Sequence, residues 1–143
     1  LDELMRLDCA GPRWVSYEPA LAWADFRPWY ARGLRWWVAG GESGGHARPF
    51  DLRWARAGVR HCLKAGAVPF VKQMGAMCVT SYYDQAQRAT YEENGWDWPD
   101  PIDWDLRDGQ PVLTSRVRIK FADRKGANPD EWEPSLQIQE FPS

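Results

Sequence analysis

Three short apolar segments of the chain each end in residues that can bind a ligand or transfer a proton. Glu18 closes the first segment, a glycine-rich loop with Glu42 and Ser43 follows the second, and Lys72 and Gln73 close the third. In a parallel sheet the carboxyl ends of the strands meet at one edge, where binding and catalytic groups collect. We therefore expect these side chains to face one crevice, with Glu18, Glu42 and Lys72 as the candidate catalytic residues.

The loop over residues 40–45, Gly-Gly-Glu-Ser-Gly-Gly, can turn sharply and direct backbone N–H groups at an anion or a polar ligand. It matches neither the Walker loop nor the dinucleotide-binding fingerprint, so a tight strand-to-helix turn is an equally good interpretation. A carboxylate near Lys72 would keep it charged, either as a ligand clamp or as a structural ion pair. Arg48 either reaches the same crevice or lies on the surface. The predicted substrate- or cofactor-binding residues are Gly40, Gly41, Glu42, Ser43, Gly44, Arg48, Lys72 and Gln73.

The cysteines and histidines predict no metal site. Cys9, Cys62 and Cys78 are far apart, and the chain contains no C-x-x-C motif. His46 and His61 are its two histidines. His61 adjoins Cys62, and neighbouring residues point in different directions on a helix. We expect one of this pair to face inward and the other outward.

Three strands and one helix must position the candidate site. Residues 13–18, 34–39 and 68–73 are rich in aromatic and branched side chains and are bounded by Gly or Pro. They lack clean polar alternation, which predicts a parallel sheet covered on both faces. Asp51 can cap a helix whose apolar residues recur at helical spacing until Gly66 ends it. Strand, helix and strand in this order form a parallel βαβ unit.

The remaining segments carry weaker signals. Residues 21–33 predict a short irregular helix before the second strand, and residues 85–93 predict another short helix. Asp-Gly at 108–109 is a turn signal, and residues 116–121 alternate like an edge strand. The chain from residue 122 onward predicts an irregular tail.

Length and charge describe an ordinary globular chain. It has 143 residues and a net charge of −2, from 18 Lys and Arg against 20 Asp and Glu. This balance excludes a general nucleic-acid binder and a polybasic membrane binder, but is compatible with a small local basic pocket. No segment has the apolar length of a transmembrane helix. We divide the chain into parallel βα units over residues 1–75 and a Trp/Tyr-rich extension over residues 76–143.

Ten tryptophans are the unusual feature of the composition. One group lies in the predicted strands and helix, where core packing is expected: Trp14, Trp36, Trp37 and Trp54. A second group lies in the predicted loops: Trp96, Trp98, Trp104 and Trp132. The loop group is either a stacking platform for bases or a set of plugs beneath a long loop. Because no basic stripe accompanies it, we favour plugs.

Three motifs carry a resemblance to a known family. Arg-Trp-Val-Ser-Tyr-Glu-Pro begins at residue 13, Trp-Trp-Val-Ala-Gly-Gly-Glu-Ser-Gly-Gly-His-Ala-Arg-Pro-Phe at 36, and Val-Pro-Phe-Val-Lys-Gln-Met-Gly at 68. With them the chain resembles the three-Cys-motif phage proteins, uncharacterised proteins of phages and bacterial mobile elements that look related to radical S-adenosylmethionine enzymes. The similarity spans about residues 10–75 and returns in the tail.

The resemblance implies more than this chain contains. Members of that family carry an amino-terminal cysteine cluster of the kind that binds an iron–sulfur cluster, and Cys9, Cys62 and Cys78 do not match its spacing. S-adenosylmethionine and the cluster are therefore implied only for an amino-terminal part, and we expect no cofactor in this chain. The expected fold is α/β, a partial (β/α) barrel-like parallel sheet of about three βα units with a long irregular carboxy-terminal extension.

Three functions fit these observations. The first is the carboxy-terminal part of a phage-encoded, radical-SAM-like enzyme of unknown substrate, in the cytoplasm of the bacterial host. The second is a non-catalytic module that binds a nucleotide or nucleic acid. The third is a structural subunit that completes a barrel by pairing with another chain, since a cut barrel leaves an unpaired strand edge. The chain starts at Leu1 in mid-pattern, as a fragment or processed product would.

Overall fold

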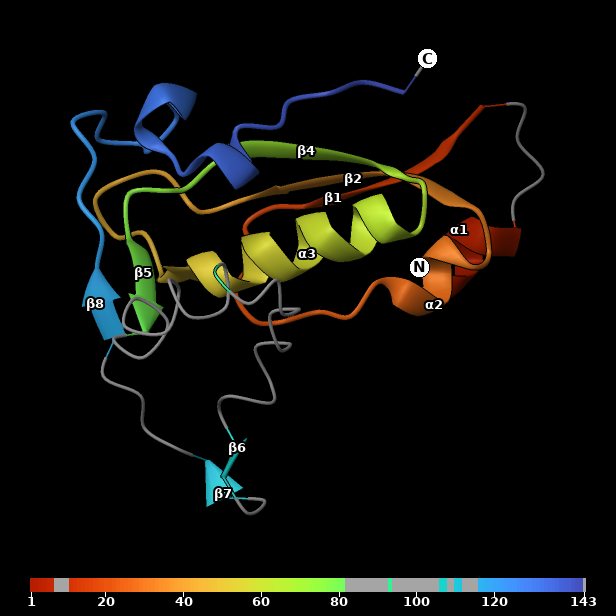
Figure 1. Cartoon of the computed structure of the whole chain (residues 1–143), viewed down its shortest axis with the longest axis horizontal. Helices are drawn as coiled ribbons and strands as arrows, with labels where there is room; N and C mark the ends of the chain where they lie inside the picture. The colour runs from red at the N-terminus through yellow and green to blue at the C-terminus, as the bar shows by residue number, and fades with distance from the viewer. Residues whose placement is uncertain (7–10, 82–92, 94–105, 108–109, 112–115, 143) are drawn as a thin grey trace.

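The centre of the protein is a sheet of three parallel strands, seen in a computed structural model that describes residues 1–6, 11–81, 93, 106–107, 110–111 and 116–142. The strands are β1 (Arg13–Tyr17), β2 (Leu34–Gly40) and β4 (Val68–Gln73), in the order β1-β2-β4. Figure 1 shows them as one layer above a long helix. The three predicted strands and their parallel pairing are confirmed.

The long helix α3 (Leu52–Lys64) lies between β2 and β4 in the chain and packs on one face of the sheet. Asp51 caps it by accepting a hydrogen bond from the backbone N–H of Arg53 at 3.0 Å, and Gly66 follows its end with φ of 68°. Both signals were predicted. Trp37 packs directly on the helix, because a Cβ on Gly58 would lie 2.4 Å from its ring. The buried core between helix and sheet includes Leu34, Trp37, Ala55, Val59, Cys62 and Val71.

The opposite face of the sheet corrects the expectation that both faces are covered. Trp14 is 49% exposed on this face and stacks at a tilt on Trp36, with ring centroids 5.2 Å apart. In the part of the chain that the structure describes, no helix covers these rings. Burial along β1 alternates between half-buried and exposed residues. The aromatic side chain of Trp14 at an exposed position hides that alternation in the sequence, so the core placement of Trp14 was wrong.

The end of the chain lies along the free edge of β4. The backbone N–H of Val71 donates to the carbonyl of Ile138 at 2.8 Å, and Phe70 forms an isolated antiparallel bridge with Gln139. Trp36 Nε1 donates to the carbonyl of Glu140 at 3.2 Å. The predicted irregular tail is therefore anchored to the sheet, and its two short 3₁₀ helices are η1 (Pro129–Glu131) and η2 (Pro134–Leu136).

A second small sheet has three strands, and one of them directly precedes α3. Strand β5 (Cys78–Ser81) pairs in parallel with β3 (Phe50–Asp51) and antiparallel with β8 (Arg116–Arg118). Strand β8 confirms the first half of the predicted edge strand. A further antiparallel pair, β6 (Leu106–Arg107) and β7 (Gln110–Pro111), flanks the predicted turn, which itself lies outside the described residues.

Two short helices complete the architecture: α1 (Asp2–Arg6) and α2 (Arg27–Tyr30). Helix α2 confirms the short helix expected over residues 21–33, whereas almost all of the helix predicted over 85–93 lies outside the described residues. The fold is α/β with an open three-stranded parallel sheet, and the described strands form no closed barrel. Among the described residues, no helix combines the length and the apolar character needed to cross a membrane.

Candidate functional site

Glu18 and Lys72, two of the predicted catalytic residues, meet on the sheet face that no described helix covers. Lys72 Nζ lies 3.2 Å from Glu18 Oε1, and the Ser16 hydroxyl donates to Glu18 Oε2 at 2.7 Å. The pair bridges the middle strand at Gly40, where a Cβ would lie 3.0 Å from Glu18 Oε1. The carboxyl ends of the strands therefore do bring these two residues together, as expected, and Gly40 leaves the space that lets them meet.

Glu42, the third predicted catalytic residue, pairs with Arg48 rather than with Lys72. Arg48 donates to it three times: Nη2 to Oε1 at 2.9 Å, Nε to Oε2 at 3.0 Å, and the backbone N–H to Oε2 at 2.9 Å. The Arg48 side chain, followed by its backbone N–H, lowers the pKa of Glu42 to about 2. The bidentate pair closes the glycine loop on itself and keeps the carboxylate ionised.

The effect of Arg48 on the pKa of Glu42 can be tested by titration. In an Arg48→Gln variant the pKa of Glu42 is expected to rise from about 2 towards its ordinary value of 4.5, followed by NMR of the side-chain carboxyl carbon. Because the folded-state pKa is depressed, the pair stabilises the fold fully above about pH 4.5 and its contribution is lost as the pH falls towards 2. A Glu42 pKa that does not move in the variant would contradict the assignment.

Gly41 and Gln73 tie the glycine loop to the end of β4. Gln73 Nε2 donates to the Gly41 carbonyl at 2.8 Å, and the Gly41 N–H donates to the Gln73 carbonyl at 3.0 Å. One step further, the N–H of Ala76 donates to the Glu42 carbonyl at 2.9 Å. These contacts fix the loop against the β4–β5 connection. Ser43 and Gly44 are exposed beyond them.

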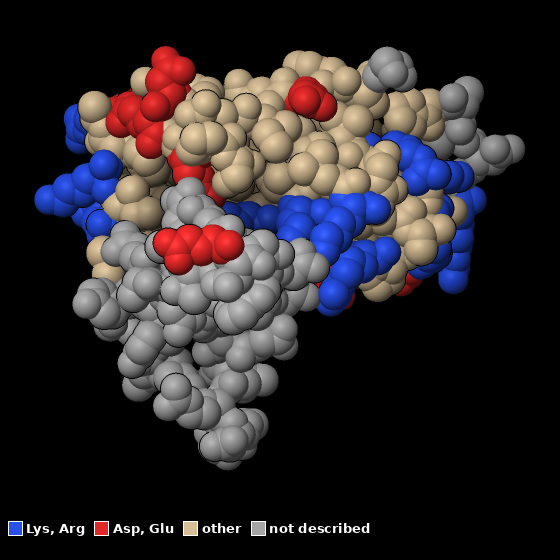
Figure 2. Space-filling model, viewed as in Figure 1, with Lys and Arg blue, Asp and Glu red and all other residues tan. Residues whose placement is uncertain are grey.

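A basic cleft lies on the outer side of this loop. It has a volume of about 660 Å³ and is bounded by the glycine loop at residues 44–47, the β4–β5 connection at 75–77 and the segment 118–125. Four cationic side chains line it: Arg118, Lys120, Arg124 and Lys125. Figure 2 shows Lys and Arg side chains gathered at the left edge of the molecule, over the segment that follows β8 in Figure 1. We call this cavity, lined by the residues just named, the basic cleft.

Asp123 is the one carboxylate among the described residues that line the basic cleft. Its side chain accepts hydrogen bonds from the backbone N–H groups of Ala127 and Lys125, at 2.5 and 3.4 Å, and these bonds lower its pKa. Asp123 thus shapes the turn with its oxygens directed at backbone donors. The cations of the cleft outnumber it, so an anion entering there meets a net positive lining.

The sequence interpretation did not identify the residues that make the cleft basic. The signal was present, because Arg118 and Lys120 alternate with the half-buried Val117 and Ile119 and thereby share the outer face of a strand. Within the structure Arg118 Nη2 also donates to the Ala76 carbonyl at 3.1 Å, which joins the two walls. Of the predicted binding residues, Gly44 lines the cleft directly.

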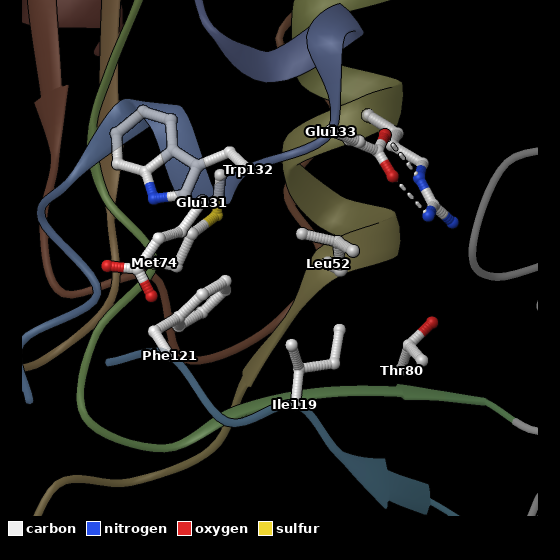
Figure 3. A pocket seen from close by; sticks show the side chains of 9 residues that line it. Leu52, Met74, Thr80, Ile119, Phe121, Glu131, Trp132 and Glu133 are labelled. Atoms are coloured by element: carbon white, nitrogen blue, oxygen red, sulfur yellow. Dashed lines mark hydrogen bonds and ion pairs between the residues drawn. The ribbon is translucent and has the colours of Figure 1, made fainter. Parts of the chain in front are cut away.

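A second, smaller cavity of about 250 Å³ adjoins the basic cleft and has a mostly apolar lining. Its apolar side chains come from Leu52, Met74, Ile119, Phe121 and Trp132, and its polar ones from Arg56, Thr80, Glu131 and Glu133. Figure 3 shows these side chains converging on one space between α3, the β4–β5 connection and the segment after β8. We call this cavity the apolar pocket.

Trp132 is fixed in the wall of the apolar pocket. It is 5% exposed and its Nε1 donates to the Gly126 carbonyl at 3.1 Å. This one loop tryptophan therefore packs as a plug, as we favoured. The other three, at positions 96, 98 and 104, lie outside the described residues.

The described cysteines do not fit the iron–sulfur cluster that the family resemblance implied. Cys62 and Cys78 are fully buried in α3 and β5, and burial raises their pKa values to about 11 and about 12. Both thiols are therefore protonated near neutral pH, whereas a cluster is held by thiolates. Cys9 lies outside the described residues. Across the part of the chain that is described, no three His, Cys, Asp or Glu side chains are grouped to hold a metal ion.

His61 corrects a smaller expectation. Both His61, at 8% exposed, and Cys62, at 0%, face inward. His61 packs edge-on against Trp23, with ring centroids 5.7 Å apart, so the α2 side of the helix is buried as well as its sheet side.

Comparison with known proteins gives one match. The family model described as "Protein of unknown function (DUF5131)" matches residues 1–124. No curated protein matches the chain. No solved structure matches it either.

Proposed function

The chain belongs to this family of proteins of unknown function (DUF5131), and we propose that it is a binding module whose basic cleft holds the phosphate of a nucleotide or nucleic acid. The observation that supports this function is the gathering of Arg118, Lys120, Arg124 and Lys125 around one cavity beside a glycine loop. The whole chain has a net charge of −2, so this concentration of positive charge is local.

The chemistry of the cleft suits a phosphate group. Arg and Lys side chains bind phosphate oxygens with charge-assisted hydrogen bonds, which are stronger than bonds between neutral groups. The walls of a cleft exclude part of the water and so weaken its screening of the charges. Gly44, at φ of 121°, gives the loop a backbone conformation that places no side chain between it and a ligand.

The three candidate catalytic residues support binding better than catalysis. Glu18 pairs with Lys72, and Glu42 is held by three hydrogen bonds from Arg48. A general acid or base works best when its pKa lies near the operating pH, and the pKa of Glu42 lies at about 2. We therefore assign Glu42 a role in positioning the glycine loop.

Titration calorimetry with inorganic pyrophosphate tests the proposed function. We expect binding that weakens as salt rises, and a Lys120→Gln/Arg124→Gln variant whose affinity is lower by about 10-fold or more. The matched control is Arg35→Gln/Lys64→Gln, which removes the same charge at the other end of the strands and should bind as the parent does. Equal losses in the two variants, or no binding by the parent chain, would refute the cleft as a phosphate site.

A second candidate function rests on the outer edge of β1, which pairs with no strand in the described part of the chain. Next to it Trp14 is 49% exposed, on the sheet face that no described helix covers. Together with the sequence motifs, this supports the proposal that the sheet is part of a radical-SAM-like barrel, phage-encoded and working in the bacterial cytoplasm, which other strands complete. Co-purified partner strands that protect the β1 amides from hydrogen exchange would support it, and a strictly monomeric mass would count against it.

A further inference from the structure

The basic cleft and the apolar pocket adjoin, because Ile119 and Phe121 line both. We propose that together they form one site for a nucleoside phosphate, with the phosphate in the basic cleft and the base in the apolar pocket. This inference rests on the proposed function and makes it more specific. It distinguishes a single nucleotide from a nucleic-acid strand.

The apolar pocket has the surfaces that a base requires. The ring of Phe121 and the thioether of Met74 lie beside the space on one side, as Figure 3 shows, and Trp132 lines the same wall. The hydrogen bond from Trp132 Nε1 to the Gly126 carbonyl fixes the buried indole in the wall, so the half-buried ring of Phe121 is the surface on which a base would stack. Aromatic side chains bind bases of any sequence by stacking, and sulfur also packs well on rings.

Polar groups on the other side of the pocket can select the edge of a base. Arg56 Nε and Nη2 donate to Glu133 Oε1 and Oε2 at 2.7 and 2.5 Å, and the pair borders the space together with the buried Thr80. In the view of Figure 3, Glu133 and Thr80 lie across the pocket from Phe121 and Trp132. A base between these walls meets stacking surfaces on one side and hydrogen-bonding groups on the other, which is the usual design of small-molecule sites.

The sizes of the two cavities favour one nucleotide. The apolar pocket, at about 250 Å³, holds a single ring system, and the basic cleft beside it is larger at about 660 Å³. All four cations line the cleft, whereas the pocket has one cation, Arg56, paired with Glu133, and a second carboxylate, Glu131. A strand of nucleic acid requires a line of positive charge along its backbone, and here the charge gathers at one end of the site.

The test compares ligands that differ by the base alone. Calorimetry with the four common ribonucleoside 5′-monophosphates and with ribose 5-phosphate is expected to show that at least one nucleotide binds about 10-fold more tightly than the sugar phosphate. In a Phe121→Leu variant, which keeps an apolar side chain but removes the ring, nucleotide affinity should fall by more than the affinity for ribose 5-phosphate, so this difference should shrink. Thermal unfolding of the variant checks that it folds.

The outcomes distinguish failure of the base pocket from failure of the proposed phosphate site. Equal affinity for ribose 5-phosphate and all four nucleotides would overturn the base pocket while leaving the phosphate site in place. Tighter binding of an oligonucleotide than of any mononucleotide would also overturn it, in favour of a strand. Failure of every phosphate, pyrophosphate included, would instead remove the proposed function. If Phe121→Leu does not fold, the comparison of ligands on the parent chain still decides.

Discussion

Replacing Asp51 with alanine is expected to lower the free energy of unfolding by about 3–5 kcal/mol, which is a large part of the stability of a domain of this size. Asp51 is 1% exposed and Arg53 is 5% exposed, and Arg53 Nη2 donates to Asp51 Oδ2 at 2.6 Å. Alanine would remove the Asp51 carboxylate from beside the buried Arg53 guanidinium. It would also remove the side chain that caps α3, the helix that covers the sheet.

A double variant separates the charge from the cap. Asp51→Asn/Arg53→Met keeps an oxygen that can cap the helix and replaces the buried ion pair with neutral groups of similar size. Because such replacements cost little when both charges leave together, we expect it to recover most of the lost stability. Urea unfolding of the two variants and the parent measures the difference. If Asp51→Ala unfolds at the parent's urea concentration, the buried pair does not hold the start of α3.

The second large effect is expected at Gly41, where an alanine Cβ would lie 2.5 Å from the Met74 carbonyl oxygen and 2.9 Å from Phe50 Cβ. The nearest of these neighbours is backbone, so the loop and the β4–β5 connection would have to move apart. We expect Gly41→Ala to cost about 2–3 kcal/mol of stability, as overpacking does in well-packed cores. The same movement separates two walls of the basic cleft, so pyrophosphate binding should fall with it.

Gly45→Ala is the matched control for Gly41→Ala. A Cβ at Gly45 meets no atom within 4 Å. The substitution should therefore change the free energy of unfolding by less than about 0.5 kcal/mol. Similar losses of stability in both variants would show that the loop tolerates no side chain anywhere, and that the close approach at Gly41 has no special role.

The sequence was sufficient to predict the βαβ unit, because each of its signals is local. Aromatic and branched residues between Gly or Pro mark the strands, and Asp51 and Gly66 mark the ends of the helix. The pairing of Glu18 with Lys72 followed from parallel topology, which places the ends of β1 and β4 at one edge. The resemblance predicted that the chain belongs to an uncharacterised family, and the match to a family model confirms that part of the prediction.

The basic cleft could not be predicted in the same way, because its walls come from residues 44–47 and 118–125, some seventy positions apart. Joining them requires the antiparallel pairing of β8 with β5, a contact between segments separated by a long stretch of chain. The sequence interpretation placed Glu42 near Lys72 because both residues lie at the ends of predicted strands. Arg48 is closer in the chain and binds Glu42 through a local turn, which the topology of the sheet does not reveal.

Locating the bound anion tests the phosphate site most directly. In ¹H–¹⁵N NMR spectra recorded during a pyrophosphate titration, the amides of Gly44, Gly45, Gly75 and Ala76 should shift together and saturate with one dissociation constant. The same titration of Lys120→Gln/Arg124→Gln should move these amides only at about 10-fold higher concentration or above. Saturating shifts confined to other surfaces, such as the one that Arg27 of α2 and Lys64 of α3 line, would contradict the assignment of the basic cleft as a phosphate site.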